Sequence, residues 1–204
     1  MFSQWFKRSR DAVGGRTRGR VAALFALAVV TVGARVGVLG ARWEHLKGDP
    51  DAYRLIAENV RQHGVYSASR QQDALRPTAF RPPLYPILLA VFARDGQVTA
   101  ASVAACHLLL GILSVLAAWK LAVRAGLGRW SYLAAGLVAC DPILLNQSTE
   151  VMTETLATFL TIIGLLTLSY MTRRQHTSAG AVHRDGASTS VMSRGDSPVA
   201  EAVE

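Results

Sequence analysis

Residues 98–123 read VTAASVAACHLLLGILSVLAAWKLAV, and this stretch decides the class of fold. Only His107 and Lys120 interrupt the apolar run, which exceeds the roughly 20 residues that an α-helix needs to cross a bilayer. Half of the 204 residues are hydrophobic and 18% are charged, against about 25% in a typical soluble domain. The sequence therefore predicts an all-α integral membrane protein and excludes a disulfide-stapled secreted domain and an ordinary cytosolic enzyme.

Three further apolar runs predict a polytopic protein, with about four transmembrane helices in all. The predicted spans are residues 21–39, 98–123, 130–145 and 151–171, which together make a membrane domain over residues 21–171. Residues 1–20 form a basic tail before the first span. Residues 172–204 are rich in small and polar side chains and predict a disordered tail. Arg35, near the outer end of the first span, is placed to snorkel to the interface.

Positive charges beside the spans predict the orientation. The leading tail is rich in arginine, the connection between the second and third spans carries three basic residues and no acid, and two arginines close the fourth span. These flanking residues are Lys120, Arg124, Arg129, Arg173 and Arg174. Lysine and arginine are enriched on the cytoplasmic side of spans. We therefore expect both termini to be cytoplasmic and residues 41–96 to form an outer loop.

The outer loop is too long and too patterned for a simple connector. Asp49 and Pro50 predict a helix start, with an acid at the N-cap and proline at the first helical position, and Gly64 predicts the end of that helix. Its apolar side chains recur at helical spacing, which is typical of a helix lying on the membrane surface. Residues 81–86 (RPPLYP) then lead into an apolar segment that predicts a second surface helix or a re-entrant turn.

Four charged residues are candidates for chemistry. Asp49 falls on the membrane side of the predicted helix, where a helix cap is the commoner use of an aspartate and catalysis is the alternative. Asp51 falls on the solvent side, and Arg81 by default contacts lipid phosphate at the interface. Glu154 lies about one turn inside the fourth span, where an ionised carboxylate is costly, so a pore, a partner charge or an active site could each retain it.

Other polar features of the sequence predict no catalytic or binding role. His107 has no nearby partner in the sequence and is interpreted as a helix-packing residue. Cys106 and Cys140 lie inside apolar runs without metal-ligand spacing, so no metal site is assigned. The net charge of +8 is not laid along one surface with interleaved aromatic residues, and no nucleic-acid partner is expected.

Several short patches, in this order and at these positions between spans, resemble the amino-terminal part of the polytopic glycosyltransferases of the C superfamily. The nearest groups are the bacterial relatives of protein O-mannosyltransferases and of the lipid A aminoarabinose transferase. The resemblance covers residues 21–170, and the patches that carry it are residues 48–53 (GDPDAY), 56–59 (IAEN), 64–66 (GVY), 81–86 (RPPLYP), 141–142 (DP) and 148–154 (STEVMTE).

This resemblance implies sugar transfer at the outer face of a bacterial cytoplasmic membrane, from a polyprenyl-phosphate donor to an acceptor hydroxyl. Asp49 takes the position of the family's general base, and Asp51 and Glu154 are the alternative or supporting acids. Arg81 takes the position expected to bind the donor phosphate. The cofactor stays open, with a divalent metal as one candidate for neutralising the departing phosphate.

Members of that family carry many more spans than are predicted here. We therefore expect a truncated copy, one piece of a split enzyme whose second membrane subunit supplies the missing spans, or an inactive short paralogue. Two other functions stay open beside the transferase. One is a non-enzymatic membrane subunit that uses the outer loop as an interaction surface, and the other is a small transporter component built around Glu154.

The predicted orientation can be tested with reporter fusions. Fusions placed after Arg18, Asp73, Arg129 and Arg174 should report cytoplasmic, outer, cytoplasmic and cytoplasmic positions, because the acid-poor basic flanks then share one side. A cytoplasmic signal after Asp73 would contradict this orientation and would remove the candidate site from the outer face.

Overall fold

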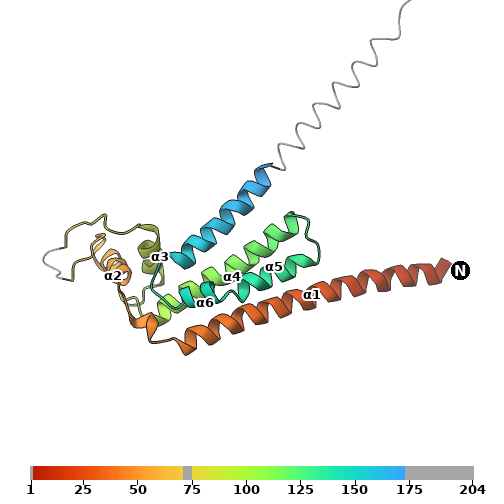
Figure 1. Cartoon of the computed structure of the whole chain (residues 1–204), viewed down its shortest axis with the longest axis horizontal. Coiled ribbons are helices and arrows are strands. Elements are labelled where there is room, and N and C mark those ends of the chain that lie inside the picture. The colour runs from red at the N-terminus through yellow and green to blue at the C-terminus, as the bar shows by residue number, and fades with distance from the viewer. Residues whose placement is uncertain (1, 71–74, 173–204) are drawn as a thin grey trace, which may run out of the picture.

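The computed structural model describes residues 2–70 and 75–172, with side chains described from Gly19 onward. The predicted tail of residues 172–204 lies outside the described residues, except for Thr172. The described part is helical (Figure 1). Its elements are α1 (Phe2–Ala41), the 3-10 helix η1 (His45–Lys47), α2 (Tyr53–His63), α3 (Leu84–Phe92), α4 (Ala100–Arg124), α5 (Trp130–Ala139), α6 (Pro142–Gln147) and a last helix, Glu154–Thr172.

Within residues 2–70 and 75–172, three helices are long and apolar enough to cross a membrane. They are Gly19–Ala41 within α1, α4 and the helix Glu154–Thr172, which correspond to the predicted spans 21–39, 98–123 and 151–171. The backbone of α1 is helical from Phe2, so this helix also runs through the predicted basic tail. The prediction of an all-α polytopic protein is confirmed.

The predicted span of residues 130–145 is divided into two helices. α5 has 10 residues, which at 1.5 Å per residue reach about half of a 30 Å hydrocarbon core. Pro142 has no amide hydrogen and cannot extend the helix that precedes it. Asp141 instead caps α6, where its Oδ1 accepts the amides of Ile143 at 2.8 Å and Leu144 at 3.0 Å.

α4 lies at the centre of the helix bundle. It packs against α1, α3 and α5. Half of its most apolar window is buried inside the protein, against 11% for α1 and 17% for Glu154–Thr172. Figure 1 shows α1, α4 and α5 running side by side, with α2 and α3 gathered at one end of them. The outer helices therefore present most of their apolar surface outward.

The two predicted helices of the outer loop are α2 and α3, and they pack on each other. Two side chains one turn apart on α2 hold the turn that leads from α3 into α4. Glu58 Oε1 accepts the amide of Val98 at 2.9 Å, and Gln62 Nε2 donates to the Gly96 carbonyl at 2.7 Å. The outer loop is thus tied to the start of the central span.

The start of α2 differs from the prediction, whereas its end agrees. The helix begins at Tyr53, not at Pro50, because Ala52 has a left-handed conformation with φ of 59° and occupies the N-cap. The end is at Gly64, as predicted. Gly64 has φ of 69°, and its amide donates to the Val60 carbonyl at 3.1 Å.

The prediction that Arg35 snorkels to the interface is wrong. Arg35 is 2% exposed and lies inside the bundle, where its guanidinium rests on the backbone of Gly111. A Cβ atom at Gly111 would lie 2.4 Å from Arg35 Cζ. The missing side chain on α4 is therefore what admits the arginine of α1 into the interior.

This contact predicts the effect of Gly111→Ala. Alanine in an open helix interior is favoured over glycine by about 1 kcal/mol. At Gly111 the new methyl overlaps the guanidinium, and overpacking of this kind typically costs about 1–3 kcal/mol. We expect a lower midpoint of unfolding for the detergent-solubilised protein. Gly164→Ala is the control, because a Cβ there meets nothing within 4 Å, and it should unfold no earlier than the unaltered chain. Equal midpoints for the two variants would contradict the contact.

Candidate active site

A chain of polar contacts joins the outer loop to the spans. The Tyr85 hydroxyl of α3 lies 2.7 Å from His107 Nε2 of α4, and His107 Nδ1 lies 2.7 Å from the Ser148 carbonyl oxygen. A carbonyl can only accept, so Nδ1 carries the hydrogen, and Nε2 of the neutral ring accepts from Tyr85. His107 and Tyr85 are 0% and 1% exposed. The chain is therefore shielded from competing water.

Aromatic rings extend this chain toward the outer surface. The ring of Tyr53 on α2 meets Tyr85 edge-on, with 5.2 Å between centroids, and Tyr85 stacks on His107 at 5.8 Å. The guanidinium of Arg81 lies 5.5 Å from the centre of the Tyr53 ring. Side chains from α2, α3 and α4 thus follow one another from the surface to the interior.

The Tyr85 hydroxyl keeps its proton in this setting. Burial raises the pKa of Tyr85 above its ordinary value, and the acidic groups of Cys106, Asp49, Glu154 and Tyr53 raise it further. Tyr85 is thus a hydrogen-bond donor to His107. The carboxylates of Asp49 and Glu154, 105 positions apart in the chain (154 − 49), both disfavour the charged form of this tyrosine.

Asp49 caps α2, as its position in the sequence favoured, although Ala52 and not Asp49 occupies the N-cap position. Its Oδ1 accepts the amide of Arg54 and its Oδ2 accepts the amide of Leu55, each at 3.1 Å. Anions are stabilised at the positive end of a helix. The first turn of α2 therefore fixes the direction of the carboxylate, and each oxygen keeps a second lone pair for another partner.

The helical spacing predicted that Asp51 points into solvent, but in the structure Asp51 pairs with another side chain. Its carboxylate forms an ion pair with Arg81 Nη2, and Arg81 Nε donates to the Asp51 carbonyl at 3.2 Å. Both side chains are about a quarter exposed, 25% for Asp51 and 26% for Arg81. The cation assigned to the donor phosphate is therefore already paired with an acid of the same loop.

Glu154 was predicted to lie about one turn inside the fourth span. In the structure it is the first residue of its helix. Its Oε2 is buried and has no hydrogen-bond partner among the described residues. An acceptor of this kind is costly to bury unless a ligand or water bonds to it. Each oxygen of Asp49 accepts one amide, whereas this oxygen accepts no hydrogen bond from the described residues.

Arg35 lines a small void inside the bundle. The void has a volume of about 10 Å³, the size of one water, and its other lining residues are Gly111, Ser114, Leu144, Gln147, Thr155 and Thr158. Arg35 Nε and Thr155 Oγ1 are buried without partners among the described residues. The guanidinium rests on Gly111, one helical turn along α4 from His107.

Sequence reasoning missed Tyr85, His107 and Arg35 as members of the site. His107 and Arg35 were each interpreted alone, as a packing residue and as a snorkelling residue. The available signal was their position inside otherwise apolar spans, where a polar side chain usually has a partner. Among the described residues, no three His, Cys, Asp or Glu side chains are placed to hold a metal ion, and we derive no step through a metal.

A protein-family model identifies the class to which this fold and site belong. The family described as dolichyl-phosphate-mannose-protein mannosyltransferase matches residues 80–184, which is 105 of the 204 residues (184 − 80 + 1). The chain belongs to this family of membrane glycosyltransferases and is an integral membrane protein. Neither a curated protein nor a solved structure matches it.

The matched segment determines which site residues the family relationship covers. It includes α3, α4, α5 and α6 and therefore takes in Arg81, Tyr85, His107 and Glu154. It begins after Asp49 and Asp51. The predicted resemblance to protein O-mannosyltransferases is confirmed, and the roles of individual residues stay predictions.

Proposed function

We propose that this chain transfers a sugar from a polyprenyl-phosphate donor to an acceptor hydroxyl at the outer face of a bacterial cytoplasmic membrane, alone or with a second membrane subunit. The observation that carries the proposal is that the amides at the start of α2 hold the Asp49 carboxylate, and that Tyr53 of the same turn contacts the buried Tyr85. α2 and α3 lie together at one end of the spans (Figure 1). A lipid-borne donor can reach a site only at such a membrane boundary.

Asp49 is the proposed general base. Its carboxylate takes the proton of the acceptor hydroxyl while the acceptor oxygen forms a bond to the anomeric carbon of the sugar. The bond from that carbon to the phosphate oxygen breaks, and its electron pair leaves with the polyprenyl phosphate. The two amides of α2 hold Asp49 in one orientation, which is what a base needs to meet its substrate.

Arg81 is the proposed partner of the departing phosphate. A guanidinium can bind two phosphate oxygens in a planar fork. Asp51 forms an ion pair with this guanidinium. The donor phosphate would replace the Asp51 carboxylate as the partner of Arg81 while negative charge develops on the lipid phosphate. Asp51 then supports catalysis by keeping Arg81 positioned beside Tyr53 before the donor arrives.

A non-enzymatic membrane subunit is the second candidate function. The observation that favours it is the large unburied surface of the outer helices: only 11% of the apolar window of α1 and 17% of that of Glu154–Thr172 is buried. Gly33 and Gly37, spaced as in close-packing transmembrane helices, meet nothing within 4 Å. A subunit carrying further spans could cover these faces in an active assembly as well as in an inactive one.

The proposed base predicts the behaviour of Asp49→Asn. The amide cannot take a proton, and losing a general base typically lowers the rate about 100- to 10,000-fold. Asparagine has one acceptor oxygen and keeps one of the two bonds to α2, so the protein should still insert and accumulate. The measurement is sugar transfer from a polyprenyl-phosphate donor in membranes that contain the chain and its neighbouring subunits.

Matched variants separate this role from a general effect on the outer loop. Asp95→Asn changes an exposed carboxylate of the same loop whose φ of 51° suits asparagine, and it should transfer at the unaltered rate. Asp51→Asn should be milder than Asp49→Asn, and Arg81→Ala should raise the KM for the donor. Unaltered rates in Asp49→Asn would refute the assignment. If the unaltered chain transfers nothing even with its neighbours present, the non-enzymatic candidate stands.

A further inference from the structure

The end of the bundle opposite the outer loop contains a cavity of about 530 Å³ that the proposed transfer does not use. α1, the end of α4 and the start of α5 surround it, and its lining combines two arginines, two aromatic rings and an apolar floor. The lining residues used below are Arg20, Leu24, Trp119, Val123, Arg129 and Tyr132. A volume of this size falls within the usual range for small-ligand sites, about 300–1,000 Å³.

The charge of this cavity is positive and uncompensated. Neither Arg20 nor Arg129 takes part in an ion pair among the described residues. The sequence from residue 98 to residue 140 contains no Asp or Glu. Arg124, at the same end of α4, is already used: it donates to Ser169 and lies 3.5 Å from the centre of the Tyr170 ring. Arg129 also lies 5.3 Å from the centre of the Trp130 ring, but this contact uses the face of the guanidinium and leaves its N–H groups for an anion.

Trp119 and Tyr132 give the cavity an aromatic wall. Their rings lie 6.1 Å apart, and tryptophan and tyrosine are the side chains that collect at membrane interfaces. The lining therefore combines positive charge with side chains typical of a membrane boundary.

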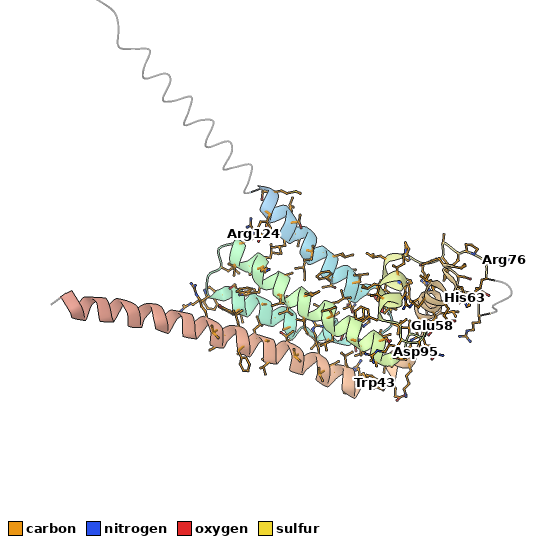
Figure 2. All side chains as sticks on the ribbon, turned by 180° about the vertical axis from the view of Figure 1, so that it is seen from behind. Trp43, Glu58, His63, Arg76, Asp95 and Arg124 are labelled. Carbon is orange, nitrogen blue, oxygen red and sulfur yellow. The ribbon has the colours of Figure 1, made fainter. Side chains whose placement is uncertain are left out.

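The position within the fold fits a membrane lipid. Figure 2 shows Arg124 at the far end of α4 from the outer-loop residues Glu58, His63 and Arg76. The cavity begins near that end, at Val123 and Arg129, and runs down to Leu24 on the apolar part of α1. A ligand with an anionic head at the boundary and hydrocarbon below would match both parts of the lining.

We propose that this cavity binds the phosphodiester headgroup of an anionic phospholipid, with Arg20 and Arg129 pairing with the phosphate, and Leu24 and Val123 contacting the start of an acyl chain. Basic pockets between spans are a recognised setting for anionic lipid heads. With the predicted orientation, this site lies in the cytoplasmic leaflet, whereas the proposed sugar transfer lies in the outer one.

Native mass spectrometry of the purified full chain tests this site. Phosphatidylglycerol and phosphatidylcholine with the same acyl chains are titrated separately, and the dissociation constants of the first bound lipid are compared. We expect phosphatidylglycerol to bind at least about tenfold more tightly, since each arginine near a surface contributes about fivefold for an anionic lipid. Equal binding of the two lipids would overturn the proposal.

Two matched double variants distinguish lipid binding at this cavity from a general effect of the net charge of the protein. Arg20→Gln with Arg129→Gln should remove most of the preference for phosphatidylglycerol. Arg61→Gln with Arg76→Gln, which removes the same charge from exposed positions of the outer loop, should retain it. Loss of the preference in both pairs, or in neither, would contradict a site at this cavity.

A further arm keeps the proposal testable if the double variant fails to fold. Inorganic phosphate at millimolar concentration should not displace the lipid, because it lacks the hydrocarbon contact. Full displacement by phosphate would show that the cavity takes no lipid in this way.

Discussion

The hydrogen bond between Tyr85 and His107 is the interaction on which the rest of this structure depends. It joins α3 of the outer loop to α4, the most buried span, and the second ring nitrogen of His107 reaches the Ser148 carbonyl beyond α6. Without water to replace a lost partner, an unpaired polar atom here would cost about 1–3 kcal/mol. The outer loop is thus held in a fixed place over the spans, and with it the start of α2, which binds the Asp49 carboxylate.

A buried positive charge, that of Arg35, lies inside the helix bundle. Arg35 is buried beside a glycine and near hydroxyl and amide side chains. A charged side chain inside a span costs more free energy than an apolar one. The contact of Arg35 with Gly111 places this charge of the first span one helical turn from His107 on α4.

The sequence predicted the helical class, three of the spans and the two outer-loop helices, because apolar run length and helical spacing are local properties. The capping by Asp49 also followed from local chemistry, although the left-handed Ala52 moved the helix start to Tyr53. The pairing of Asp51 with Arg81, the burial of Arg35 and the partner of His107 are contacts between distant segments. No spacing rule encodes them, since each depends on how segments that are distant in the chain pack together.

Nitrogen NMR of the His107 imidazole in the full chain tests the central hydrogen bond most directly. The account predicts that Nδ1 carries the hydrogen and that Nε2 is an acceptor, with a shift of the Nε2 resonance in Tyr85→Phe and none in Tyr66→Phe, whose hydroxyl meets the Arg81 carbonyl instead. A hydrogen found on Nε2 alone, or an Nε2 resonance that Tyr85→Phe leaves unchanged, would contradict the link between the outer loop and the spans.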